Sequence, residues 1–215
     1  MGTLIDDNND GVCDCIDIQI SAWLEGAYNT SLNEMTTTLS AQRGLLPGQT
    51  PSSQLATPTP AGQPYQASPW NYPGTEGAGW TDANYTGNET DWVLLSFRTG
   101  IQKSTEVAMT AGLLMKDGVI ELPDRCALSS AITGPVYIVL EHRNHIGIMT
   151  AQPVDIVGGI LMHDFRSADS YHDATSFGQK QTSTGEWVMY AGDASQMDFP
   201  SFDICLLYTS PSPRD

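Results

Sequence analysis

Apolar residues recur at every second position in several short stretches of the chain. This two-residue period appears at 16–24, 91–98 and 105–115. It is typical of a strand that has one face against a core. Further short apolar runs follow at 119–122, 135–142, 146–150, 154–157, 160–165 and 186–191. Asp117-Gly118 and Gly158-Gly159 separate two pairs of these runs, which predicts hairpins because glycine adopts the positive φ that a tight turn needs.

Seven or more short strands without a strong helical pattern predict an all-β chain. The expected fold is an antiparallel β-sandwich of the Ig-like or jelly-roll type. Only residues 31–46 have weak helical spacing, and we expect a short helix or irregular structure there. With 215 residues, the chain is long enough to bury a substantial core.

A long proline-rich segment interrupts the strands. Residues 47–73 hold seven of the thirteen prolines. Proline removes a backbone donor and restricts the residue before it, so we expect an extended surface loop. Trp70, Tyr72 and Trp80 then have two interpretations. They attach the loop to the body of the domain, or they form an exposed platform that stacks on a sugar ring.

The charge of the chain argues against two classes of partner. The sequence has 25 acidic and 9 basic residues, a net charge of −16. Proteins that bind nucleic acid or anionic lipid need a cationic face. No apolar run approaches the roughly 20 residues of a membrane span, and no signal peptide pattern is present. We therefore expect no nucleic-acid partner and no membrane span.

The strongest chemical pattern lies near the N-terminus and reads Asp6-x-Asn8-x-Asp10-Gly11-x-x-Asp14-x-x-Asp17. Calcium prefers about six to eight oxygen ligands from a flexible loop with a glycine at its sharp turn. The predicted Ca²⁺ ligands are the side chains of Asp6, Asn8, Asp10, Asp14 and Asp17 and the carbonyl of Val12. The alternative is a solvated acidic turn. A much weaker pattern of the same kind begins at Gly192-Asp193. There Met197 stands at the acidic position that corresponds to Asp10, and Asp198 stands at the position of the glycine that corresponds to Gly11.

Two cysteines flank one predicted calcium ligand. Cys13 and Cys15 stand on either side of Asp14, and Cys126 is a candidate internal partner. The sequence leaves the disulfide pairing of Cys13, Cys15 and Cys126 open. A Cys-x-Cys pattern without a second pair is a poor zinc site.

His142-Arg143-Asn144-His145 forms a compact polar turn between two apolar runs. As a functional pair, the two histidines would be metal ligands or proton-transfer groups. Strand alternation puts positions 142 and 145 on opposite faces unless the turn re-aims them, and the one carboxylate beside them in sequence is Glu141. We expect hydrogen-bonded residues that fix a turn. The sequence has no nucleophile elbow, phosphate loop or dinucleotide motif, so no catalytic residue is assigned and no enzyme is predicted.

Residues 205–215 (CLLYTSPSPRD) resemble one translated frame of a sequencing-library adapter. We therefore exclude them from the expected fold. Their removal takes away Cys205, together with one Arg and one Asp, so the net charge of −16 is unchanged.

Several segments together resemble the C-terminal module of large secreted or surface bacterial proteins. They are 23–29 (WLEGAYN), 44–47 (GLLP), 91–95 (DWVLL), 142–149 (HRNHIGIM) and 189–193 (MYAGD). Such proteins carry thrombospondin type 3-like and dockerin-like calcium loops and a sorting domain for outer-membrane export. The resemblance implies an extracellular or cell-surface location and no transferable reaction. It also implies that a cysteine near Asp14 pairs with one in an adjacent upstream repeat.

The predicted organisation is a calcium loop at 1–17 and a β-sandwich at 18–166 that contains the proline-rich insertion. An extension at 167–204 leads into the dockerin-like segment. The predicted function is a non-catalytic extracellular structural or adhesion module of a larger secreted bacterial protein, in which calcium stiffens the joint to an upstream domain. The expected partners are neighbouring domains of the same polypeptide and a glycan or cell-surface ligand. The alternative is a carbohydrate-binding module that uses Trp70, Tyr72 and Trp80.

Overall fold

The computed structural model describes residues 15–53, 56–123, 128, 129, 132–167, 170–172 and 178–192. In this part of the chain, regular structure is almost entirely β-strand, which confirms the predicted fold class. The strands are β1 (Asp17–Ser21), β2 (Tyr28–Asn29), β3 (Glu34–Met35), β4 (Glu89–Arg98), β5 (Glu106–Met115), β6 (Ile120–Glu121), β7 (Tyr137–His142), β8 (His145–Met149), β9 (Ile156–Val157), β10 (Ile160–Asp164), β11 (Gln179–Gln181) and β12 (Trp187–Met189). The helical turns are η1 (Thr38–Arg43), η2 (Asp82–Asn84) and η3 (Lys103–Thr105). None of the helices among these residues has the length and apolar character needed to cross a membrane.

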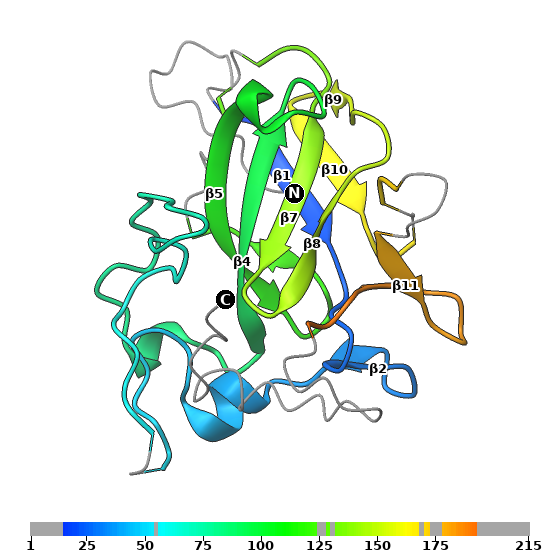
Figure 1. The fold of residues 1–215 in the computed structure, drawn as a ribbon. Helices are drawn as coiled ribbons and strands as arrows, with labels where there is room; N and C mark the ends of the chain where they lie inside the picture. The colour runs from blue at the N-terminus through cyan, green and yellow to red at the C-terminus, as the bar shows by residue number, and fades with distance from the viewer. Residues whose placement is uncertain are drawn as a thin grey trace, which may run out of the picture.

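The largest sheet has the strand order β6-β5-β4-β7-β8, and every neighbouring pair is antiparallel (Figure 1). The central strand β4 directs Val93, Leu95 and Phe97 into the main hydrophobic core, as their alternation predicts. The turn between β5 and β6 contains Gly118, whose φ is +85°. A Cβ atom at this position would lie 2.9 Å from the carbonyl oxygen of Ala22, so the turn needs glycine for both its backbone angle and its space.

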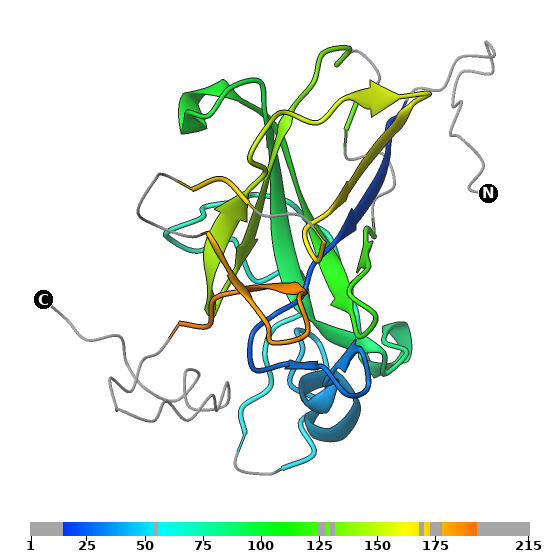
Figure 2. The same cartoon turned by 90° about the vertical axis from the view of Figure 1, so that its right-hand side faces the viewer.

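A three-stranded sheet in the order β1-β10-β9 forms the second layer (Figure 2). Its residues Ile18, Ile20 and Leu161 are buried in the main core with the apolar side chains of β4 and β7. β1 pairs with β10 in parallel, whereas we expected antiparallel strands throughout. The two strands lie far apart in the sequence, so no hairpin fixes their relative direction. The result is a sandwich of two unequal sheets.

The proline-rich loop covers part of the outer face of the large sheet. Trp92 and Leu94 of β4 point to this face and pack with Tyr65 and Tyr72 of the loop and with Leu113 of β5. β4 is therefore buried on both faces from its start to Phe97. Coverage of both faces explains why the stretch 92–97 is nearly continuous in apolar character.

The same loop protects an edge of the sheet. β6 pairs with only a short part of β5, at Leu113 and Leu114. Further along β5, the carboxylate of Glu76 accepts a hydrogen bond from the backbone N–H of Ala111 (3.1 Å), and the Tyr72 hydroxyl lies within hydrogen-bond distance of a β5 carbonyl. Unpaired strand edges invite pairing with another chain, so these contacts satisfy groups that would otherwise be exposed.

The C-terminal part of the described chain packs onto the same core. β11 and β12 form an antiparallel pair, and Val188 and Met189 of β12 are buried in the main core. β11 reads QKQ, without apolar alternation, which is why the sequence did not predict it. Residues 31–46 form the short strand β3 and the π-helical turn η1, in agreement with a short helix at this place.

Candidate functional site

The two histidines of the polar turn lie on the same side of the sheet and contact each other. Arg143 and Asn144 form a two-residue turn, so His142 and His145 become direct partners in the β7–β8 register. Cross-strand partners share a face. Their Nδ1 atoms are 2.8 Å apart, and the rings meet edge to face. The opposite faces expected from simple alternation are therefore wrong, because alternation does not continue through a hairpin turn.

A carboxylate from the centre of the sheet completes the cluster. Asp91 stands on β4 on the same face as Val93, and its side chain is almost fully buried. One carboxylate oxygen lies 3.1 Å from Nε2 of His142, and the other contacts the guanidinium of Arg143 and accepts the backbone N–H of Trp92. The sequence offered Glu141 as the nearest carboxylate, but the sheet register supplies Asp91 instead.

Asp91 is held in its charged form by these neighbours. Burial alone would raise the pKa of this carboxyl, because a charge is poorly solvated in the interior. The positive charge of Arg143 and the hydrogen bond from His142 outweigh burial and hold the pKa of Asp91 well below its usual range. The buried carboxylate and guanidinium therefore compensate each other in the folded protein.

The outer end of the cluster connects three distant segments. Nε2 of His145 lies 3.0 Å from the backbone carbonyl of Glu25, which follows β1. The Glu25 carboxylate forms an ion pair with Lys180 of β11 and accepts the backbone N–H of Ala191, 3.1 Å away. The polar contacts thus run from β4 through the β7–β8 hairpin to both the first and the last parts of the described chain.

The hydrogen bonds of the histidine pair require more protons than a neutral pair carries. Asp91 and the Glu25 carbonyl are both acceptors, so each Nε2 must carry a proton, and the contact between the Nδ1 atoms requires a third. Two neutral imidazoles carry only two protons. Burial, and then the nearby His142, lower the pKa of His145 to about 3, so the third proton is disfavoured near neutral pH. Satisfying all three contacts would need an imidazolium, and burial disfavours that charge on His145.

The cluster has some features of a catalytic or metal site and lacks others. It brings two imidazoles and a carboxylate together, as the proton-transfer interpretation requires. His142 and His145 are only 3% and 8% exposed, however, and their ring nitrogens already contact protein groups. No group of three or more His, Cys, Asp or Glu side chains among the described residues is arranged to hold a metal ion. The arrangement is best suited to joining strands and loops.

The predicted calcium loop is described only at its last position. Asp6, Asn8, Asp10, Val12 and Asp14 lie outside the described residues, as do the weaker pattern after Gly192 and the segment 205–215. Asp17 is the first residue of β1, where its backbone N–H donates to Gly159. Its carboxylate is partly exposed and accepts a hydrogen bond from Gln19 (2.7 Å). Among the described residues, Asp17 forms no ion pair.

Cys15 is part of a disulfide bond and is 4% exposed. The other cysteines of the chain, at positions 13, 126 and 205, lie outside the described residues. The backbone of Cys15 forms an isolated antiparallel β-bridge with Ser129. The next residue, Ile16, donates its N–H to the carbonyl of Leu128 (2.9 Å). Cys15 thus lies within the predicted calcium loop, two residues before β1.

The loop aromatics are largely occupied by contacts within the protein. Tyr72 is buried, and Trp70 and Trp80 are partly buried against the cluster on the outer face of the sheet. Trp80 packs against Trp92 with ring centroids 5.5 Å apart, and it meets Tyr85 edge to face. These contacts correspond to the first interpretation of the aromatics, in which they attach the loop.

The sequence missed Asp91 and Arg143 as members of the cluster. Its pattern predicts only that Asp91 begins a strand and that Arg143 lies in a turn. One signal was available: an aspartate next to a run that is apolar on both faces must find a partner, because an unpaired buried charge is costly. Comparison with known proteins found no matching family model, no matching curated protein and no matching solved structure.

Proposed function

We propose that this chain is a non-catalytic, extracellular structural or adhesion module of a larger secreted protein, and that Ca²⁺ bound at its N-terminal loop stiffens the joint to a preceding domain. The observation that carries the proposal is the position of Asp17. It is both the last ligand position of the calcium pattern and the first residue of β1. Ile18 and Ile20 directly after it are buried in the main core. A metal ion held by Asp17 would therefore couple the loop to the core.

Two further features support this function. The disulfide of Cys15 suits an oxidising compartment, because cytosolic thiols are normally kept reduced. The polar cluster around Asp91 has the burial and contacts of a structural tie rather than of an open active site. In this proposal His142 and His145 join the β7–β8 hairpin to the segment after β1, and they take no part in a reaction.

Calcium titration of the chain tests the proposal. We expect a calorimetric binding signal and a melting temperature that is higher in Ca²⁺ than in EGTA. At a calcium concentration of about 100 times Kd, mass action gives about 2.7 kcal/mol of stabilisation. For a chain of this size, that corresponds to a shift of roughly 5–10 °C.

Three variants separate ligation from general charge effects. Asp10→Ala removes a predicted ligand, and Asp17→Asn removes charge but keeps an oxygen that can accept from Gln19. Both are expected to reduce the calcium-dependent shift. Asp155→Asn is the matched control, because Asp155 is exposed and lies in the loop before β9. The idea is wrong if calcium gives no heat and no shift, or if Asp155→Asn reduces the shift as much as Asp17→Asn does.

A further inference from the structure

Polar side chains gather on the outer face of the large sheet near the start of β5. Ser96 and Arg98 are two residues apart on β4, so they share a face. Arg98 pairs with Tyr137 on β7, and it pairs with Glu106 on β5 across a register shift between Phe97 and Arg98. Glu141 on β7 pairs with a β4 residue on this same outer face. Five polar residues from three neighbouring strands therefore stand side by side.

Three of these residues have buried polar atoms without a hydrogen-bond partner in the part of the chain that the structure describes. The atoms are Oγ of Ser96, Nε of Arg98 and Oε2 of Glu106. Ser96 is 1% exposed, whereas Arg98 and Glu106 are half-buried. Buried polar groups are normally satisfied, and each unmade bond costs about 1–3 kcal/mol. An isolated case would be unremarkable, but three on adjacent positions of one face indicate a surface whose hydrogen bonding is incomplete.

Charges of both signs meet at the same place without forming ion pairs. Burial raises the pKa of Glu141, the positive charges of Lys103 and Arg98 act in the opposite direction, and the negative charge of Glu106 adds to the rise. The four groups are therefore close enough to influence one another. None of them is in an ion pair with another described residue.

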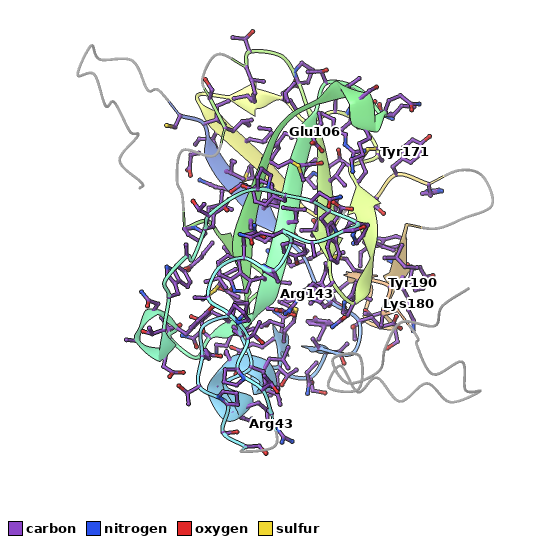
Figure 3. All side chains as sticks on the ribbon, turned by 60° about the vertical axis from the view of Figure 1, so that its left-hand side comes forward. Arg43, Glu106, Arg143, Tyr171, Lys180 and Tyr190 are labelled. Atoms are coloured by element: carbon purple, nitrogen blue, oxygen red, sulfur yellow. The ribbon has the colours of Figure 1, made fainter. Side chains whose placement is uncertain are left out.

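Gly147 of β8 lies beside Glu141. Gly147 has no side chain, and a Cβ atom there would lie 3.4 Å from Cγ of Glu141. Glu141 and Tyr137 are both half-buried, so each presents part of its surface to solvent. In Figure 3 the loop crosses in front of the sheet below Glu106, which is labelled at the upper end of β5. Glu106 thus lies at the end of the sheet that the loop does not cross.

The mixture of groups selects a chemical class of ligand. Arg98 and Lys103 would repel a metal cation, and Glu106 and Glu141 would repel a phosphate or sulfate. Hydroxyl groups suit all four residues, because each hydroxyl both donates and accepts hydrogen bonds. The Tyr137 ring adds an apolar surface that can pack against the C–H face of a sugar.

We propose that the outer sheet face around the half-buried residues Arg98, Glu106, Tyr137 and Glu141, next to the buried Ser96, binds a neutral saccharide. This surface is separate from the Trp70, Tyr72 and Trp80 side chains of the loop. It is also independent of calcium at the N-terminus, so either proposal can fail without the other.

Backbone-amide NMR titration with glucose, galactose, mannose, N-acetylglucosamine and cellobiose at millimolar concentrations tests the site. We expect shifts at the amides of Ser96, Arg98, Glu106 and Glu141 with at least one of these sugars. Saturation of those shifts gives the dissociation constant of the sugar. Shifts confined to Trp70 and Trp80 would overturn the proposal in favour of the loop aromatics, and no shift with any sugar would overturn it as well.

Variants then test the assigned residues. Glu141→Gln removes a charged acceptor at constant size, and Arg98→Gln removes the guanidinium. Each is expected to weaken binding by about tenfold, the usual effect of losing a hydrogen bond to a charged group. Asp155→Asn is the control of equal charge change, and it should bind like the parent chain. Melting curves exclude unfolding as the cause. Unchanged affinity in both site variants, with both folded, contradicts the assignment.

Discussion

Acidification is expected to weaken the fold through His145. Burial, together with the neighbouring His142, lowers the pKa of His145 to about 3, well below the value of 6.5 for a solvated histidine. The folded state therefore binds a proton at this site less readily than the unfolded state does. Stability from this site is complete above about pH 6.5 and is lost as the pH falls toward about 3. The groups that act on His145 are His142, Asp91 and the backbone carbonyl of Glu25. Arg143 and Lys180 form ion pairs with the carboxylates of Asp91 and Glu25.

The expected size follows from the shift in pKa. Each pH unit between the unfolded and the folded pKa changes the free energy of unfolding by about 1.4 kcal/mol. From about pH 7 to about pH 5, His145 should therefore remove about 2 kcal/mol of stability. With a urea dependence of about 2 kcal/mol per molar, the midpoint of unfolding should fall by about 1 M.

Urea unfolding of the parent chain and of His145→Gln at both pH values measures this contribution. Glutamine can still donate to the Glu25 carbonyl but does not titrate, so most of the loss should disappear in the variant. Other groups titrate in this range, including His163, whose pKa is lowered by burial, but they are present in both proteins and cancel in the comparison. His172→Gln, at an exposed position, is the control for replacing a histidine with glutamine.

Two results would refute this reasoning. The first is an equal loss of stability in the parent chain and in His145→Gln between the two pH values. The second is an NMR spectrum in which both ring nitrogens of His145 carry protons at neutral pH. That spectrum would mean that the third proton, which satisfies all contacts of the pair, is retained in spite of burial.

Three other substitutions test the remaining contacts. Asp91→Asn removes the buried carboxylate that compensates the guanidinium of Arg143, so the free energy of unfolding should fall by about 3–5 kcal/mol in urea unfolding. An unchanged urea midpoint would count against a stabilising role of the cluster. Tyr72→Phe removes the hydroxyl that contacts the Glu76 carboxylate and the Met109 carbonyl. We expect the free energy of unfolding to fall by about 1 kcal/mol and the amides along this edge of β5 to exchange faster. Unaltered exchange would contradict the role of these contacts in protecting the strand edge. Gly118→Ala places a methyl group at positive φ and against a carbonyl, and a melting temperature at least as high as the parent's would disprove the requirement for glycine.

The sequence predicted the strands better than their arrangement. Val93, Leu95 and Phe97 alternate, and the structure places all three in the main core. Alternation is a local property, so it can be read from neighbouring residues. The parallel pairing of β1 with β10 joins segments that are distant in the chain, and no local pattern encodes that partnership. Short strands such as β11 lack alternation altogether and depend on tertiary packing.

The polar cluster shows how far sequence reasoning can go toward a site. Asp91 and His142 are 51 residues apart, and Glu25 and His145 are 120 apart, so their contacts depend on sheet register and loop packing. The need for a partner was nevertheless readable, because a carboxylate beside a strand buried on both faces cannot remain uncompensated. The chain has only nine lysines and arginines to supply that charge. Arg143, in the tight turn that follows a long apolar run, was among the few candidates. The burial expected for this strand, together with the small number of lysines and arginines, would therefore have favoured a pair of Asp91 with Arg143. Neither feature predicts the histidine pair that packs beside it.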